Sequence, residues 1–100
     1  MPMYFAAICR DKPGALQLRL DTRPAHVEHL NALNASGVLK IAGPLLGEDG
    51  KPFGSLLIFE CADLAEAEAV AAADPYAKAG LFETVEISPW NWTFNPPEAR

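Results

Sequence analysis

Hydrophobic residues gather in short segments of the chain, each bounded by polar, proline or glycine residues, which is typical of β-strands. This pattern predicts four strands, over residues 3–9, 38–46, 55–61 and 82–88. In the first strand Phe5, Ala7 and Cys9 point to one face. Tyr4 and Ile8 point to the other face, so this strand is apolar on both faces. The third strand has the same character, whereas a sheet face that contacts water is normally polar.

The residues between the first two strands show the wider spacing of a helix. One stripe with this spacing consists of His26, Leu30 and Leu33. We expect the helix to begin at Arg23-Pro24, because proline suits the first turn, and to end at Ser36 before a glycine. The preceding stretch, 15–20, is expected to form a separate short helical turn.

A second helix is predicted after the third strand. Asp63 suits the position that caps its start, and Glu66 completes a pair that is typical of helix beginnings. The segment is rich in alanine, which favours helix, and runs to about Ala73. Asp74-Pro75 then breaks the pattern, because proline biases the residue before it away from helix. A short turn leads into the fourth strand, which gives the order β-α-β-β-α-β.

This order places both helices on one face of a single antiparallel sheet, because crossovers between parallel strands are right-handed. The other face is bare although its residues are apolar, and such patches usually mark an interface. We therefore expect a homodimer in which two sheets pack face to face. The alternative is that the end of the same chain, with Trp90 and Trp92, folds back over the bare face.

Length and composition fit one globular domain over residues 1–100, with 91–100 as a partly extended or frayed tail. Half of the residues are hydrophobic, and 8 Lys and Arg stand against 13 Asp and Glu. The net charge of −5 disfavours nucleic acid and anionic membranes as partners. Neither a signal-peptide pattern nor an apolar run of about 18 residues is present, so a cytoplasmic protein is expected.

His26 and Asp74 are the first candidates for chemistry. The predicted helix places His26 near a helix N-terminus, where the dipole favours the neutral imidazole that a general base requires. Asp74 on one ring nitrogen would fix the tautomer of that histidine. Both residues also have simpler interpretations, His26 as a core-edge histidine bonded to backbone and Asp74 as the cap of a turn.

Four further residues are candidates for binding a ligand. Arg19 and Arg23 can hold an anionic substrate or can be solvated helix charges. Ser55 follows a glycine and offers a hydroxyl, without the surroundings of a serine nucleophile. Tyr76 is expected near Ser55, in a cleft between the helices and the sheet.

Three other features carry weaker alternatives. His29 follows His26 at a spacing that a metal can use, but further ligands are lacking, and no metal or other cofactor is predicted. Pro2, once the initiator methionine is removed, would be a secondary amine of the kind that small tautomerases use as base or nucleophile. Cys9 and Cys61 lie in apolar strands without Cys-x-x-Cys spacing, so buried reduced thiols are expected.

Several short motifs together resemble the YciI-like (YCII-related) family over about residues 3–88. In chain order they are Arg19-Leu-Asp-Thr-Arg23-Pro-Ala-His26, Ala42-Gly43-Pro44, Gly54-Ser55, Ala73-Asp74-Pro75-Tyr76 and Ala79-Gly80-Leu81. Their order and spacing, more than any single motif, carry the resemblance.

The resemblance implies an α+β fold of the ferredoxin-like type, whose antiparallel sheet pairs with a second copy in a dimeric α/β barrel. It also implies a site built from the family's histidine and aspartate, which match His26 and Asp74, with Arg19, Arg23 and Ser55 at matching positions. Related barrels include isomerases, monooxygenases and dehalogenating enzymes that act on small ring compounds, although a fold alone does not fix a function.

We therefore predict a small cofactor-independent enzyme in which His26 is a general acid and base oriented by Asp74. Its chemistry would be proton abstraction or elimination on a small, aromatic or anionic metabolite. The alternative is a non-catalytic dimeric module that uses the same cleft to bind a small ligand or a partner protein. A purely structural domain is the third interpretation.

Overall fold

The computed structural model describes residues 3–97, so Pro2 and the last three residues of the expected tail, 98–100, lie outside the described residues. The elements are β1 (Tyr4–Asp11), α1 (Leu16–Ser36), β2 (Leu39–Leu46), β3 (Pro52–Glu60), α2 (Leu64–Ala72), α3 (Pro75–Lys78) and β4 (Phe82–Trp90). This is the predicted order with the short helix α3 added. Within residues 3–97, no helix is both long enough and apolar enough to cross a membrane.

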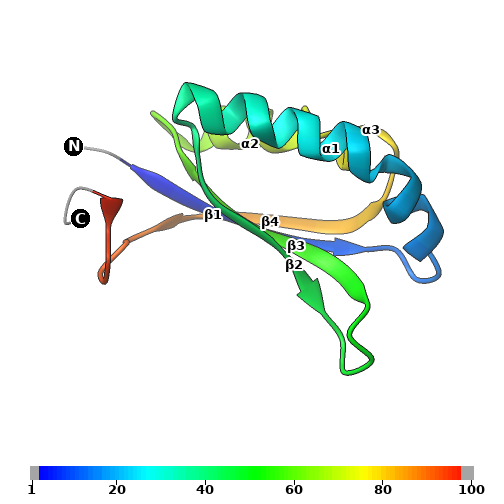
Figure 1. Cartoon of the computed structure of the whole chain (residues 1–100). Coiled ribbons are helices and arrows are strands. Elements are labelled where there is room, and N and C mark those ends of the chain that lie inside the picture. Colours follow the sequence, from blue (N-terminus) through cyan, green and yellow to red (C-terminus); the bar gives the residue numbers. More distant parts are fainter. Residues whose placement is uncertain (1–2, 98–100) are drawn as a thin grey trace.

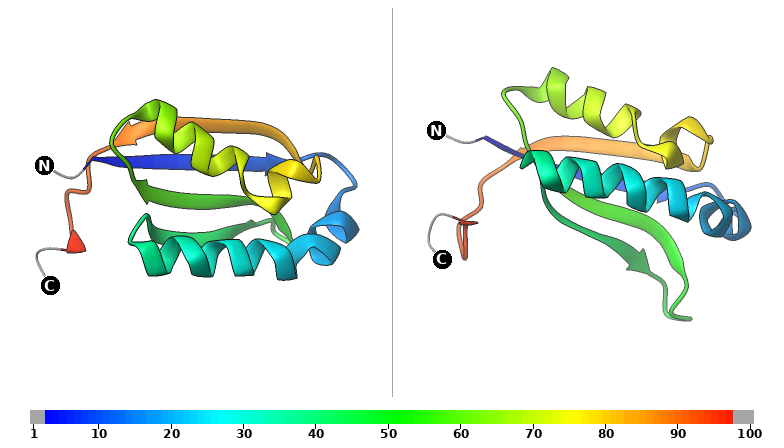
Figure 2. Two further views of the ribbon diagram at one scale, coloured as in Figure 1. Left: turned by 90° about the horizontal axis from the view of Figure 1, so that it is seen from above. Right: turned by 45° about the horizontal axis from the view of Figure 1, so that its top comes forward.

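The strands form one antiparallel sheet in the order β2-β3-β1-β4, and all three helices lie on one of its faces (Figures 1 and 2). This is the ferredoxin-like α+β arrangement expected from the sequence. β1 and β3 are the central strands and carry most of the buried residues of the sheet. β2 and β4 are the edges, where most side chains remain at least partly exposed.

The core lies between the central strands and the helices. Phe5, Ala7 and Cys9 of β1 belong to it, together with Leu57 and Phe59 of β3. The alternation along the first strand placed Phe5, Ala7 and Cys9 on one face, and that placement is confirmed. Leu30 and Leu33, from the stripe predicted on α1, pack against this core.

Helix α1 differs from the prediction at its start. It begins at Leu16, so the stretch 15–20 does not form the separate turn that we expected. Pro24 lies inside the helix, where it has no N–H to donate to the carbonyl of Leu20, and α1 changes direction near this point (Figures 1 and 2). The helix begins before the proline because its first part anchors Arg19, whose side chain is buried against β1 and β3.

The second half of the chain follows the predicted caps. The Asp63 side chain accepts the backbone N–H of Glu66 at 2.9 Å and caps α2. After α2, Asp74 caps the short helix α3, where the sequence pattern predicted only a turn. Strand β4 then continues to Trp90, beyond the predicted end at residue 88.

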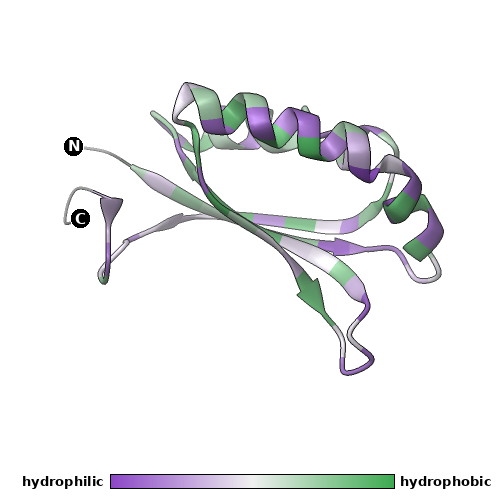
Figure 3. Cartoon of the chain, in the orientation of Figure 1, coloured by the Kyte–Doolittle hydropathy of each residue, from purple (hydrophilic) through white to green (hydrophobic). Residues whose placement is uncertain are grey.

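The sheet face opposite the helices is open and unevenly apolar. One row of cross-strand neighbours on this face consists of Ile41, Ile58, Ala6 and Ser88. The next row consists of Gly43, Leu56, Ile8 and Glu86. Both rows are without polar side chains from β2 to β1 and become polar on β4, which carries polar and apolar residues in turn (Figure 3).

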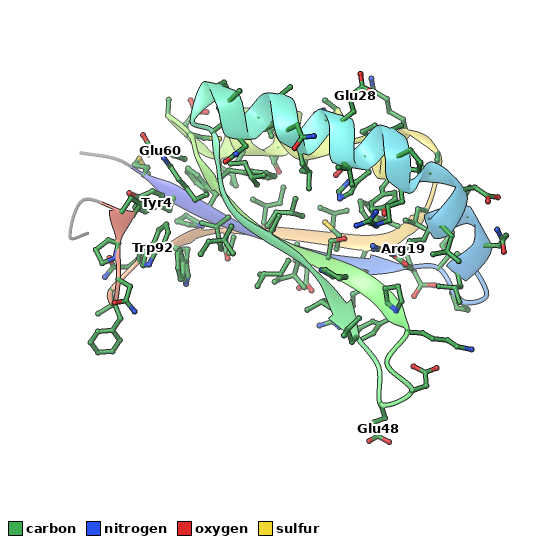
Figure 4. The ribbon with its side chains drawn as sticks, viewed as in Figure 1. Tyr4, Arg19, Glu28, Glu48, Glu60 and Trp92 are labelled. Carbon is green, nitrogen blue, oxygen red and sulfur yellow. The ribbon has the colours of Figure 1, made fainter. Side chains whose placement is uncertain are left out.

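The end of the chain covers one corner of the open face. Trp92 packs edge to face against Tyr4, with ring centroids 5.3 Å apart, and Trp90 lies 5.5 Å from Trp92. Figure 4 shows Tyr4 and Trp92 together at the end of the sheet where β1 begins. Up to residue 97, where the described part of the tail ends, it does not extend over the face as far as β2, where Ile41 is 40% exposed.

Candidate functional site

One side of α1 carries three polar residues of the site. Arg19, Arg23 and His26 recur at the spacing of a single helix face. Figure 4 shows Arg19 directed from α1 toward the sheet, whereas Glu28 points away from it. Between α1 and the sheet lies a cavity of about 180 Å³, lined by Arg19, Arg23, His26, Val27, Leu30, Ala42, Gly43, Pro44, Ser55, Leu57 and Tyr76.

His26 and Asp74 are in direct contact although they lie 48 residues apart. Nδ1 of His26 is 2.8 Å from Oδ1 and 3.0 Å from Oδ2 of Asp74, and both side chains are buried. In a neutral ring whose Nδ1–H donates to this carboxylate, Nε2 is the nitrogen that can accept a proton. The two residues that the sequence selected for acid–base chemistry are therefore brought together.

Asp74 also performs the simpler role considered for it. Its Oδ1 accepts the backbone N–H of Tyr76 at 2.9 Å and so caps α3. Its backbone is extended, with φ −62° and ψ 131°, as expected for a residue before proline. One carboxylate thus fixes the start of a helix and the orientation of the histidine.

The position of His26 in its helix differs from the prediction. Because α1 begins at Leu16, His26 lies in the middle of the helix, where the dipole of the N-terminus has little effect. Its surroundings come instead from Asp74 and from Tyr76, whose ring is stacked on the imidazole at 3.9 Å between centroids and 16° between planes. The expectation that the helix dipole acts on His26 is therefore wrong, and the side chains of Asp74 and Tyr76 form its surroundings instead.

Tyr76 lies between His26 and Arg19. The guanidinium carbon of Arg19 is 4.6 Å from the centre of the Tyr76 ring. Arg19 and His26 are two helical turns apart, about 10.5 Å along the axis, and the ring fills that interval. Burial raises the pKa of Tyr76, an effect that the charge of Arg19 partly offsets, so its phenol is protonated at neutral pH.

Arg19 is held by a carboxylate that the sequence pattern did not single out. Its Nε donates to Oδ2 of Asp11 at 2.6 Å and its Nη2 to Oδ1 at 2.9 Å. Burial by itself lowers the pKa of a guanidinium, but the bond and charge of Asp11 raise the pKa of Arg19 above its ordinary value. Asp11 lies two residues after Cys9, so continuing the strand alternation by one step places it on the helix-covered face.

Ser55 and Arg23 complete the polar lining of the cavity. The Oγ atom of Ser55 accepts a hydrogen bond from Nη2 of Arg19 at 3.0 Å, which leaves its own hydrogen to be donated. Arg23 is exposed, and within the part of the chain that the structure describes no carboxylate pairs with it. The charge of Arg19 is thus balanced by Asp11, whereas that of Arg23 is not.

The remaining titratable groups near the site are less suited to chemistry. Burial, aided by the nearby charge of Asp74, raises the pKa of the Cys9 thiol to about 12, so Cys9 is not a nucleophile at neutral pH. His29 does not line the cavity, and its Nε2 is buried without a hydrogen-bond partner among residues 3–97. In the same residues, no group of three or more His, Cys, Asp and Glu side chains is placed to hold a metal ion.

A family model described as the YCII-related domain matches residues 3–91. The chain belongs to the YCII-related family. It is 37% identical over 98 residues to Protein YciI of Escherichia coli O6:H1, a match that covers 92% of this chain and 100% of the relative. It is also 38% identical over 72 residues to an Emericella nidulans protein named "Derivative of benzaldehyde biosynthesis cluster protein C". This match covers 65% of this chain and 74% of that protein.

The YCII-related chain also resembles a solved enzyme structure. This is 5-chloro-2-hydroxyhydroquinone dehydrochlorinase from Burkholderia phenoliruptrix in complex with 2,5-dihydroxybenzoquinone, with a TM-score of 0.81 and 35% sequence identity. The match covers 89% of this chain and 94% of that chain. The suspected family and the ferredoxin-like fold are therefore confirmed, and a structural neighbour of this fold is an enzyme of small molecules.

Proposed function

We propose that this YCII-related protein is an enzyme that uses His26 to take up and return a proton on a small ring compound. The observation that carries the proposal is the buried contact between Asp74 and His26, which lines the cavity. A general base needs an unprotonated nitrogen with a fixed tautomer, and the Asp74 carboxylate supplies the fixed tautomer. The same carboxylate stabilises the imidazolium that forms when Nε2 accepts a proton.

The proposed reaction is an elimination or an isomerisation in which protons and electrons balance. Nε2 of His26 removes a proton from a hydroxyl or carbon of the ring. The electron pair of the broken bond moves into the ring and either expels an anionic leaving group or forms a new double bond. The imidazolium then returns its proton to the leaving group or to another ring atom, so no oxidant is consumed.

The cavity supports a substrate with one ring and a negatively charged oxygen. Its volume of about 180 Å³ is close to that of cavities, about 150 Å³, that bind benzene. Leu30 and Leu57 give it apolar walls, while the unpaired charge of Arg23 attracts an anion and Ser55 offers a hydroxyl. The dehydrochlorinase, whose name specifies a chlorinated hydroxyhydroquinone, supports this class of substrate.

The proposed enzyme works as a homodimer that pairs the open sheet faces. The rows from β2 to β1 present apolar side chains on a face that the helices leave uncovered. The same face of a second copy covers these side chains in one self-complementary contact. Sedimentation velocity over a range of concentrations tests this, and a monomer at micromolar concentration contradicts it.

Turnover of hydroxylated and chlorinated hydroquinones, followed by their ultraviolet and visible absorbance, tests the proposed chemistry. We expect His26→Gln to lower kcat/KM by about 10²- to 10⁴-fold, because that is the usual contribution of a general base. Asp74→Asn is expected to lower it as well, since an amide no longer fixes the tautomer or stabilises the imidazolium.

Glu28→Gln is the matched control on α1, because Glu28 points away from the cavity (Figure 4). Its activity is expected to equal that of the unaltered protein. If His26→Gln turns over substrate at the unaltered rate, the proposal is wrong. Binding of these compounds without any turnover by the unaltered protein would instead indicate a non-catalytic binding module.

A further inference from the structure

Asp11 is a buried carboxylate close to the site but outside the cavity. Its side chain is 6% exposed, and Arg19 is its ion-pair partner through two hydrogen bonds. Asp11 is absent from the cavity lining, whereas Arg19, Tyr76 and His26 are all part of it. The hydrogen bonds of Asp11 therefore reach the cavity lining through Arg19.

Arg19, Tyr76 and His26 form a stack with a carboxylate at each end. Asp11 binds the guanidinium of Arg19 by both of its oxygens, at 2.6 and 2.9 Å. Asp74 holds Nδ1 of His26 at 2.8 Å. Tyr76 lies in between, 4.6 Å from the guanidinium carbon and 3.9 Å from the centre of the imidazole. Because the three groups are planar and packed together, the tilt of each restricts the tilt of the next.

We propose that Asp11 is a positioning residue that sets the orientation of His26 through Arg19 and Tyr76. A bidentate carboxylate fixes the plane of a guanidinium, which otherwise has many rotamers. The guanidinium then holds one side of the Tyr76 ring, and the ring holds the imidazole against Asp74. The proposal rests on the proposed function for what the orientation achieves, whereas the contacts themselves do not depend on that function.

Asp11 has a second effect that follows from charge. It neutralises Arg19, so that Arg23 is the cation left to attract an anionic ligand. Without Asp11, the charge of Arg19 becomes available to the cavity that its side chain lines. Loss of Asp11 therefore misaligns the base but adds attraction for an anion, and these two effects move kcat and KM in different ways.

Steady-state kinetics of Asp11→Asn test this difference. We expect kcat to fall by about 10- to 100-fold, because small misplacements of a catalytic group have effects of that size. KM for an anionic substrate is expected to stay level or fall. Asp11→Glu keeps the carboxylate and is expected to recover most of the lost kcat.

Asp21→Asn is the matched control, since it makes the same chemical change at an exposed carboxylate of α1 that binds Gln17 at 2.8 Å. It is expected to leave both kinetic constants unchanged. A rise in KM with unchanged kcat in Asp11→Asn contradicts the positioning role.

Nuclear magnetic resonance gives a readout that needs no substrate. The carbon-bound protons of the His26 ring lie over Tyr76 and are shielded by its ring current. In Asp11→Asn these resonances are expected to move toward the positions of an unstacked histidine, and in Asp21→Asn they are expected to stay in place. Unchanged resonances in folded Asp11→Asn overturn the inference, whatever its activity.

The same measurement separates the inference from the proposed function. Displaced resonances in a protein that converts no substrate support the inference and count against the proposed function. If the unpaired guanidinium prevents Asp11→Asn from folding, the double variant Asp11→Asn/Arg19→Met removes the charge together with its partner. Its His26 resonances are expected to shift in the same direction, and resonances identical to those of the unaltered protein overturn the inference.

Discussion

On the helix-covered face of the sheet, polar side chains are buried among apolar ones, whereas on the open face every charged side chain is at least partly exposed. Between the covered face and the helices lie Ser55 of β3, Arg19 and His26 of α1 and the α3 cap Asp74, each less than one tenth exposed. The open face carries apolar rows that end in polar residues on β4. Because desolvated polar groups are expensive unless they are paired, the covered face is where chemistry is supported. The open face instead presents apolar side chains that the helices leave uncovered, and such a surface supports assembly with a second chain.

Among changes that act on assembly or stability, the largest effect is expected on the open face, from Ile41→Arg. This change places a charge among the apolar rows and is expected to raise the dissociation constant of the proposed homodimer by about 100-fold, on the order of 3 kcal/mol. Sedimentation equilibrium measures the constant. Thr84→Arg is the control, because it adds the same side chain to the polar part of the same face. Equal weakening by both changes would mean that the apolar rows do not form the contact.

A smaller effect is expected where β1 and β3 meet, from Gly54→Ala. A Cβ atom at Gly54 would lie 2.4 Å from the carbonyl oxygen of Cys9, which is backbone and cannot simply turn away. We expect a loss of about 1–3 kcal/mol in the free energy of unfolding, measured in urea. Gly43→Ala is the control, since a Cβ there meets nothing within 4 Å and the change is expected to be neutral or slightly stabilising. Similar losses at both glycines would contradict this contact as the cause.

The smallest effect is expected in the pH dependence of stability, from the two buried cysteines of the core. Burial raises the pKa of Cys9 to about 12 and that of Cys61 to about 11. Both thiols are protonated in folded and unfolded chains below the ordinary value of 9.0, so they add no pH dependence there. As the pH rises from 9 toward 11–12, the unfolded thiols ionise first and stability falls, by at most about 1.4 kcal/mol per pH unit for each thiol.

Urea unfolding at about pH 8.5, 9.5 and 10.5 measures this loss of stability. The double variant Cys9→Ala/Cys61→Ala removes both thiols and serves as the reference for other groups that titrate in the same range. Its stability is expected to fall less steeply with pH than that of the unaltered chain. Parallel slopes would show that the thiols are not protected from ionisation by the fold.

The strands were predictable because their signals are local, and His26 and Asp74 could be selected as candidates because they match a family. Alternation placed Phe5, Ala7 and Cys9 together on one face of the first strand, and the core contains all three. The motifs that resemble the YCII-related family named the histidine and the aspartate. Their contact across 48 residues was a hypothesis that the geometry bears out.

The start of α1 and the role of Asp11 could not be read in the same way. Pro24 is a strong local signal for a helix start, and it was overridden by the burial of Arg19 in the preceding turns. Asp11 stands before Lys12-Pro13, where a charged residue is typical of a turn. Its partner lies on another element, so its purpose becomes visible only when β1 and α1 are packed together.

The cap that Asp74 places on α3 has a consequence for how the readiness of the site can be observed. The same Oδ1 atom lies 2.9 Å from the amide nitrogen of Tyr76 and 2.8 Å from Nδ1 of His26. When this carboxylate swings away, the amide loses its protection from deuterium in the solvent at the moment the imidazole loses its partner. The exchange rate of one backbone amide then reports the fraction of molecules whose histidine is out of line. Hydrogen exchange at the Tyr76 amide thus measures, without any ligand, how often His26 is separated from Asp74.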